Sequence, residues 1–458
     1  MILEESRRNV GNSFYLCLFK HSIIVEKMLE KPPVASEQEA LHAFKSISVD
    51  ELKRVNTEYP YWDKVKYMSV PSGVSHKDVW HALKWMRRLN RTMLKFGNYP
   101  FSFTITNEML EMLHYFDLHI GGALTETEEI PSENRQAYLI SSIMEEAIAS
   151  SQMEGAATTR EVAKEMLRKK TKPKNKGQQM IVNNYRTINY IKEHSNEDFS
   201  IERLKNIHRL MTENTLEDGS DVGQFRDHDN ILVLDAITGD IAHIPPPQEE
   251  LEGLLGDLEM FFNHDGDRFI HPIIKAIIVH FMLSYIHPFT DGNGRTARSL
   301  FYWYMIKKGY RLIEFMPISR VIAKTKRRYE KAFLYTEQDE NDLTYFILYH
   351  LRAMKKAYEE LKLYLKRKTE ENKSVALLAS IKGINHRQAQ IIQIVHGKPN
   401  SVFTVKEIEN RFAVSNFTAR ADLEGLVTIG FLTALQSNKV KRTYVKSADF
   451  DTLIGKKV

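Results

Sequence analysis

The chain has little cysteine, little charge imbalance and no long apolar stretch. Its 458 residues include a single cysteine, Cys17, so no disulfide can form within the chain and a reducing compartment is compatible. We expect Cys17 to be a small packing residue. No apolar run reaches the length needed to cross a bilayer, and the first residues do not resemble a secretory signal. These features predict a cytoplasmic protein with no membrane partner.

The overall composition is that of an ordinary folded protein, with 43% hydrophobic and 27% charged residues. A formal net charge of +5 is small for this length and does not by itself indicate a nucleic-acid partner. No internal repeat or low-complexity tract is present. The length predicts two or three domains.

Helical periodicity dominates the sequence, which predicts a mainly α architecture. Residues 76–96 are expected to form a helix, because Trp80, Leu83, Met86 and Leu89 recur at helical spacing. A further helix is expected to begin at Thr158, which forms a capping-box pattern with Glu161. The clearest β pattern is "NILVLDAITGDIAHIPPP", residues 230–247, which predicts an isolated hairpin.

The stretch "HPFTDGNGRTAR", residues 287–298, places polar and charged groups between two apolar segments. The proline after His287 disfavours a helical conformation there, so the preceding apolar helix is expected to end with the imidazole at its tip. Gly292 and Gly294 permit backbone conformations that other residues resist, and a new helix is expected to start near Asn293. The free N–H groups of this helix start predict an anion-binding site.

Two arginines and an aspartate add charge to this site. Arg295 and Arg298 would lie on one side of the new helix and offer positive charge to phosphate oxygens. Asp291 would repel bare phosphates unless a divalent cation lies between them, and Mg²⁺ suits this role, with Mn²⁺ as an alternative. An imidazole with a pKa of about 6.5 accepts a proton from a hydroxyl at neutral pH. The stretch therefore predicts phosphoryl or nucleotidyl transfer with His287 as the base.

The same stretch resembles the motif of the Fic family. The matching residues are His287, Pro288, Phe289, Asp291, Gly292, Asn293, Gly294, Arg295 and Arg298. The resemblance implies a Fic-fold helical bundle that transfers AMP from ATP to a hydroxyl side chain of a target protein and of itself. It implies His287 as the catalytic base and Asp291 as the metal ligand. The residues that it implies for nucleotide binding are Phe289, Gly292, Asn293, Gly294, Arg295 and Arg298.

Residues 150–155, "SSQMEG", resemble the inhibitory motif of the family at Ser150, Glu154 and Gly155. They end a helix expected at about 138–155. The resemblance implies a class II type of chain, in which an N-terminal inhibitory helix precedes the catalytic motif. Glu154 would pair with Arg298, so the guanidinium would not hold the γ-phosphate and the α-phosphate of ATP would be misaligned.

Two more segments extend the resemblance. The segment from "GQFRDHDNILVL" to "IAHIPPP", residues 223–247, is similar to the family's flap, which holds a target segment against the site by main-chain hydrogen bonds. Its expected target-positioning residues are Ile231, Leu232, Val233 and Leu234. Residues 327–351 resemble later helices, some of which line the nucleotide pocket. Ser284 stands where related chains often have glutamate, and we interpret it as a structural variation outside the reaction.

The C-terminal segment, residues 386–458, has a different pattern. Thr404 and Ser415 are placed to cap two short helices, and two short strands follow around a basic tip. This order resembles a winged helix-turn-helix domain, which binds DNA or a protein partner. The candidate DNA contacts are Asn416, Arg420, Lys439, Lys441 and Arg442.

The expected organisation is therefore an accessory helical domain at 1–125, a Fic domain at 126–350, a linking helix at 351–385 and a winged helix domain at 386–458. Two alternatives to AMP transfer stay open. Glu154 could activate water and remove AMP from a modified protein, or the chain could be a DNA-binding regulator that senses nucleotide. The sequence does not identify the target protein, and it leaves a homo-oligomer open.

Overall fold

The computed structural model of the chain describes residues 29–121, 135–235, 238–381, 383–412, 414–436 and 442–457. Cys17, the candidate DNA contacts Lys439 and Lys441, and the domain boundary expected at residue 125 lie outside these ranges. Within them the protein is mainly helical, as predicted, with three antiparallel two-stranded sheets. None of the described helices combines the length and apolar character that a membrane crossing requires.

The first part of the chain contains both helices and a hairpin. Its elements are α1 (Glu37–Ser46), α2 (Val49–Val55), α3 (Trp62–Val65), α4 (His76–Leu89), β1 (Arg91–Phe96), β2 (Tyr99–Thr104) and α5 (Asn107–His119). Trp80, Phe116 and Phe281 belong to one hydrophobic core, so this part packs directly on the helices that follow.

The helix predicted at 76–96 is wrong after Leu89. Helix α4 ends at Leu89, and residues 91–96 instead pair in register with 99–104 as β1 and β2. The turn between the strands uses Gly97 at φ 56°, a left-handed conformation that suits glycine. Burial alternates along β1, with Thr92 and Phe96 buried, so strand pairing outweighs the local helical spacing.

The middle of the chain is a helical bundle with one small hairpin. Its elements are α6 (Arg135–Met153), α7 (Arg160–Lys169), α8 (Lys176–Glu193), α9 (Ile201–Thr212), β3 (Val233–Leu234), β4 (Ile241–His243), α10 (Leu251–Asn263), α11 (Pro272–Ile286), α12 (Asn293–Lys307), α13 (Ile318–Lys324), α14 (Lys326–Gln338) and α15 (Thr344–Ala379). Helix α11 is buried on nearly every side, because its residues are apolar all round. It packs against α12 at the centre of the bundle.

The capping residue of α7 differs by one position from the prediction. The side chain of Thr159, rather than Thr158, accepts a hydrogen bond from the Val162 amide. Gly155, at φ 92°, follows the end of α6 in the left-handed conformation that was expected. The chain therefore turns between α6 and α7 as predicted, but the second helix starts one residue later.

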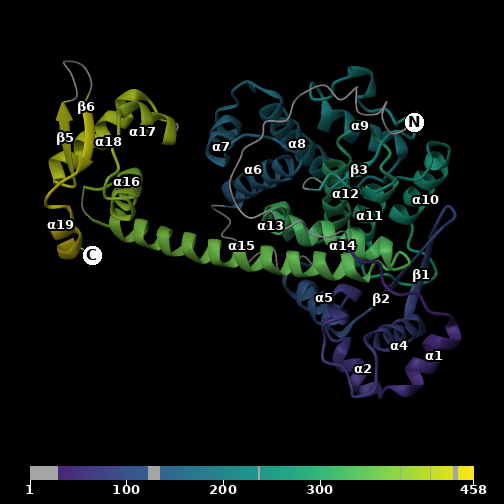
Figure 1. Cartoon of the computed structure of the whole chain (residues 1–458). Coiled ribbons are helices and arrows are strands. Elements are labelled where there is room, and N and C mark those ends of the chain that lie inside the picture. The colour runs from purple at the N-terminus through teal and green to yellow at the C-terminus, as the bar shows by residue number, and fades with distance from the viewer. Residues whose placement is uncertain are drawn as a thin grey trace.

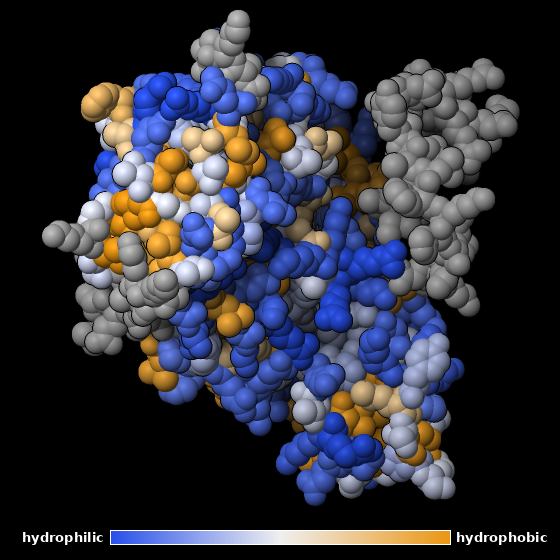
Figure 2. Space-filling view, turned by 90° about the vertical axis from the view of Figure 1, so that its left-hand side faces the viewer, coloured by the Kyte–Doolittle hydropathy of each residue, from blue (hydrophilic) through white to orange (hydrophobic). Residues whose placement is uncertain are grey.

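The last part forms a separate core at the far end of α15 (Figure 1). Its elements are α16 (His386–Gly397), α17 (Val405–Phe412), α18 (Asn416–Ile429), β5 (Leu432–Gln436), β6 (Arg442–Lys446) and α19 (Phe450–Lys457). Ser415 caps α18 as predicted, and Gly430 ends it at φ 93°. The molecular face on this side is largely hydrophilic, with smaller hydrophobic patches (Figure 2).

Candidate active site

The predicted base lies at the C-terminal end of the buried helix α11. His287 caps this helix with φ 49° and ψ 56°, a left-handed conformation that is uncommon for a residue with a side chain. Its Nδ1 lies 3.2 Å from the Ser284 carbonyl oxygen. Because a carbonyl only accepts, Nδ1 carries the proton and the Nε2 lone pair is free. Burial lowers the pKa of His287 to about 4, so the ring is neutral and ready to accept a proton.

Residues 287–292, which we call the catalytic turn, are joined to the start of α12 by hydrogen bonds of one side chain. The Phe289 amide donates to Asn293 Oδ1 at 3.0 Å, and Asn293 Nδ2 donates to the Phe289 carbonyl at 2.7 Å. The Phe289 ring is buried and stacks on His208, with the ring centroids 3.7 Å apart. Phe289 and Asn293 are candidate nucleotide-binding residues, and their side chains also shape the turn.

Gly292 caps α12 and fits tightly against α9. It has φ 84°, and a Cβ atom there would lie 2.8 Å from Thr212 Cγ2 and 3.2 Å from His208 Nε2. We expect Gly292→Ala to lower the free energy of unfolding by about 2–4 kcal/mol, from backbone strain plus the clash. Gly309 is the matched control, because it has φ 90° with nothing near a Cβ, so Gly309→Ala carries the strain alone. Equal losses in urea denaturation of the two variants would contradict this packing.

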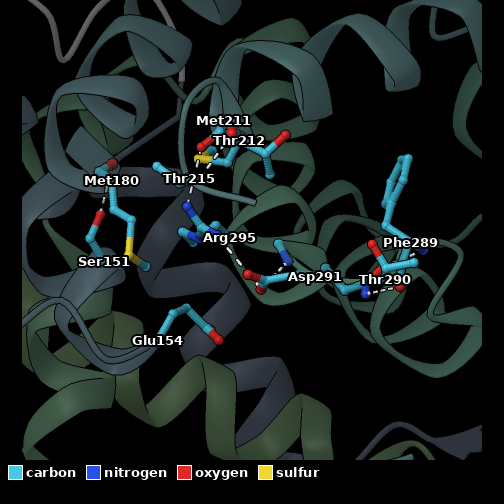
Figure 3. A network of polar contacts seen from close by, with 12 residues as sticks. Ser151, Glu154, Met180, Met211, Thr212, Thr215, Phe289, Thr290, Asp291 and Arg295 are labelled. Atoms are coloured by element: carbon cyan, nitrogen blue, oxygen red, sulfur yellow. Dashed lines mark hydrogen bonds and ion pairs between the residues drawn. The ribbon is translucent and has the colours of Figure 1, made fainter. Parts of the chain in front are cut away.

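Arg295 is a buried guanidinium that lacks part of its hydrogen bonding. Its Nη1 donates to the Met211 carbonyl at 3.2 Å, whereas Nε and Nη2 have no hydrogen-bond partner among the described residues. Asp291 Oδ1 lies 3.7 Å from Nη2, and the Asp291 side chain is 51% exposed. Figure 3 shows Arg295 between Met211 and Asp291, with Glu154 nearby. A buried cation with free donors suits a phosphate oxygen.

Arg298 is held by the end of helix α6. Its Nε donates to Ser150 Oγ at 2.9 Å, and its Nη2 donates to the Ser150 carbonyl at 3.0 Å and to Glu154 Oε1 at 2.9 Å. The guanidinium is only 4% exposed. Glu154 also covers Gly294, where a Cβ atom would lie 2.4 Å from Glu154 Oε1. The structure thus pairs Glu154 with Arg298, as the inhibitory motif implied.

These groups meet in a pocket of about 250 Å³. Of the predicted site residues, those that line it are Glu154, Val233, Leu234, His287, Gly294 and Arg298. Ile231 and Leu232 are outside this lining, although they belong to the same hairpin. Phe289, Asn293 and Arg295 lie buried beside the pocket rather than in its wall. The hairpin and the catalytic turn therefore face one another across the pocket.

The third wall of the pocket comes from α14, with Lys326, Tyr329 and Phe333. Residues 327–351 were compared with pocket-lining helices, but no residue among them was singled out. A tyrosine and a phenylalanine four residues apart also fit an ordinary core face, so their spacing alone did not distinguish the two roles. Ser284 also lines the pocket, and its Oγ donates a hydrogen bond to the His280 carbonyl at 3.1 Å.

Two buried residues that position the turn were not predicted. His208 Nδ1 accepts a hydrogen bond from the Gly223 amide at 3.0 Å, and its Nε2 lies 2.8 Å from the Asp291 carbonyl. Burial lowers the pKa of His208 to about 4, which keeps the ring neutral in this arrangement. The second residue, Arg226, donates from Nε to the His287 carbonyl at 3.1 Å. Both contacts join residues that are distant in sequence, so local spacing did not predict them.

The side chains near the catalytic turn include one candidate ligand for a metal ion, the Asp291 carboxylate. Among the described residues, no group of three or more histidine, cysteine or acidic side chains is arranged to hold a metal ion. The half-exposed Asp291 carboxylate still fits Mg²⁺ or Mn²⁺, because such ions take most of their ligands from water and substrate phosphates. Asp291 is therefore the candidate metal ligand.

The candidate DNA contacts that the structure describes lie in the C-terminal unit. Asn416 and Arg420 are exposed on α18, where Phe417 is 82% exposed. Asn416 Nδ2 lies 3.3 Å from Glu409 Oε2, and Arg442 pairs with Glu424 at 3.1 Å. The first turn of α18 thus presents polar and aromatic groups to solvent.

Comparison with known proteins agrees with the catalytic motif. Residues 198–305 match the model of the Fic/DOC family. The protein adenylyltransferase Fic of Drosophila virilis is 30% identical over 149 residues, which are 32% of this chain and 28% of that protein. The protein of the same description from Culex quinquefasciatus is 31% identical over 137 residues, 30% of this chain and 25% of that protein. The chain thus spans less than a third of these curated relatives.

Solved structures include a Fic family protein from Desulfovibrio desulfuricans. It covers 75% of this chain and 97% of its own, with 18% identity and a TM-score of 0.46. The family match spans α9, the hairpin β3–β4, the catalytic turn and α12 up to residue 305. The likeness to the Fic/DOC family thus lies in residues 198–305, which include the catalytic motif.

Proposed function

We propose that this protein is an enzyme that transfers AMP from ATP to a hydroxyl side chain of a target protein and of its own chain. The observation that carries the proposal is the meeting of His287, Gly294 and Arg298 in one pocket that faces the hairpin β3–β4. The relatives described as protein adenylyltransferases support the same reaction class. The donor would be ATP, and the acceptor a serine, threonine or tyrosine hydroxyl.

In the proposed step, His287 Nε2 takes the proton of the target hydroxyl. The hydroxyl oxygen forms a bond to the α-phosphorus of ATP, the bond from that phosphorus to the bridging oxygen of the β-phosphate breaks, and pyrophosphate leaves. The free donors of Arg295 and the N–H groups at the start of α12 would bind phosphate oxygens. Mg²⁺ or Mn²⁺ held by Asp291 would neutralise phosphate charge.

Glu154 would keep this reaction slow. Its carboxylate pairs with the Arg298 guanidinium and fills the space above Gly294. We propose that the phosphates of ATP bind at both places. A carboxylate in this place repels a phosphate as well as competing for its donors. Ser150 would hold Arg298 ready for nucleotide when Glu154 moves away, because two of the guanidinium contacts come from Ser150 alone.

The position of a radioactive label in ATP tests the reaction class. The Glu154→Gly protein should become labelled when ATP carries the label on the α-phosphate and stay unlabelled when the label is on the γ-phosphate. Labelling from the γ-phosphate alone would show that the protein transfers a phosphoryl group instead of AMP. Without label from either position, the proposed function fails.

The pH dependence of the transfer rate follows from the low pKa of His287. A neutral imidazole is needed to accept the proton, and a pKa of about 4 keeps it neutral at higher pH. In the Glu154→Gly protein we expect a rate that is flat from roughly pH 6 to pH 8 and that falls only below roughly pH 5. Glu154 raises this pKa, so its removal does not move the fall to higher pH. An inflection near the ordinary histidine pKa would contradict the assignment.

We also propose that residues 386–457 form a winged helix domain that docks DNA or a protein. The support is the order α17, α18, β5, β6 and the exposed residues Asn416, Phe417 and Arg420 near the start of α18. Binding of a DNA duplex that weakens steeply with added salt would indicate phosphate contacts. Binding of a protein partner that is insensitive to salt would favour docking instead.

A further inference from the structure

Arg226 joins three separate pieces of backbone around the site. Its guanidinium Nη1 donates to the His228 carbonyl at 3.1 Å and to Asp229 Oδ1 at 2.8 Å, and Nη2 donates to the Pro246 carbonyl. His228 and Pro246 lie before and after the hairpin β3–β4, which we call the flap. The contacts therefore close the base of the flap.

The same side chain reaches the catalytic turn. Arg226 Nε donates to the His287 carbonyl at 3.1 Å, and the Arg226 amide donates to the Pro288 carbonyl at 2.9 Å. The Arg226 side chain is only 1% exposed, so these carbonyls and Asp229 replace the water that the cation lost. The five donors of a guanidinium lie in a fixed plane, which suits it to acceptors on three segments at once.

His287 needs such support because its backbone is strained. A left-handed conformation costs a residue with a side chain roughly 1 kcal/mol or more, and it persists only where the surroundings enforce it. The His287 amide is held by the Leu283 carbonyl at 3.0 Å. Its carbonyl is held by Arg226. The left-handed cap directs the imidazole toward the pocket that the flap covers.

We propose that Arg226 is a positioning residue that fixes the His287 base and the flap relative to each other, so that a target segment on the flap meets the imidazole in one geometry. This inference rests on the proposed function. It predicts that loss of Arg226 slows the transfer step and leaves ATP binding intact, because Arg226 contacts neither Arg295 nor Arg298.

The test uses the full chain in the Glu154→Gly background. Arg226→Gln should lower the transfer rate at saturating ATP by about 10- to 100-fold, the effect of a base misplaced by roughly 1 Å, while the Kd of ATP changes less than about twofold. Arg226→Lys, which keeps the charge without the fork, should lose nearly as much. Arg203→Gln should change neither quantity, since the partners of Arg203 are Glu197 and Asp198.

Hydrogen exchange gives a readout that does not require activity. Amides of the flap base and of the catalytic turn should exchange faster together in Arg226→Gln and Arg226→Lys, and at the original rate in Arg203→Gln. If Arg226→Gln does not fold, Arg226→Lys decides both measurements. An unchanged transfer rate, a matching loss of ATP affinity, or unchanged exchange overturns the inference. A Glu154→Gly protein that transfers no AMP overturns the proposed function alone, since exchange still tests Arg226.

Discussion

Glu154→Gly is expected to raise self-modification with ATP by about tenfold or more over the unaltered chain. Glu154 Oε1 lies 2.9 Å from Arg298 Nη2, and it also covers Gly294. Removing it frees a buried cation that keeps its Ser150 contacts, so the donor is available without rearrangement. A gain of only about 1.4 kcal/mol in productive ATP binding is enough for a tenfold rate. The measurement is the initial rate of label transfer from ATP labelled on the α-phosphate.

Two further variants separate charge from size at this position. Glu154→Gln keeps the volume and removes the charge, so its rate should lie between those of the unaltered chain and Glu154→Gly. Glu161→Gln changes an exposed acid in the first turn of α7 and should leave the rate unchanged. Unchanged labelling in Glu154→Gly would refute inhibition by this residue. Loss of a measurable AMP-removing activity in that variant would support the reading in which Glu154 activates water.

His287→Ala in the Glu154→Gly background should reduce AMP transfer by about 10²- to 10⁴-fold, the usual contribution of a general base. The imidazole offers its Nε2 lone pair to the hydroxyl proton, because Nδ1 donates to the Ser284 carbonyl. ATP affinity should change little, since the phosphate contacts that we propose come from Arg295, Arg298 and the start of α12. The measurement pairs the transfer rate with ATP binding to the same protein.

The left-handed backbone of His287 makes a second substitution necessary. Alanine is strained at φ 49°, whereas asparagine tolerates this conformation, so His287→Asn removes the base with less disturbance of the turn. Both variants should lose transfer to a similar degree. His194→Ala removes a histidine that stacks on Tyr190 and should transfer AMP like the parent. Transfer by His287→Asn at the parent rate would remove His287 from the reaction.

Local sequence was sufficient to predict features that depend on neighbouring residues. Backbone preferences of proline and glycine predicted that α11 ends at His287 and that α12 starts near Asn293. The structure confirms both positions. The hairpin could be predicted because two apolar runs flank a turn and the second run ends in prolines. The pairing of Glu154 with Arg298 was foreseen from a resemblance rather than from spacing, since 144 residues separate the two.

Features that depend on distant partners were missed or misjudged. His208 touches the Asp291 carbonyl from 83 residues away, and Arg226 touches the His287 carbonyl from 61 residues away. His208 has no neighbours that mark it as part of a site, and Arg226 lies in a segment that resembles the flap but was not singled out within it. The contacts of Phe289 and Asn293 within the turn were not predicted, because the motif marks them as nucleotide-binding residues without showing their partners. Residues 91–96 were misjudged because their partner strand, not their own spacing, decides their conformation.

The most direct measurement is a crystal structure of the Glu154→Gly protein with a non-hydrolysable ATP analogue and Mg²⁺. The account predicts phosphates against the first turn of α12, with Arg298 and the free donors of Arg295 on their oxygens and the α-phosphate facing His287 Nε2. An analogue bound elsewhere, or one whose phosphates lie away from His287 and both arginines, would contradict it.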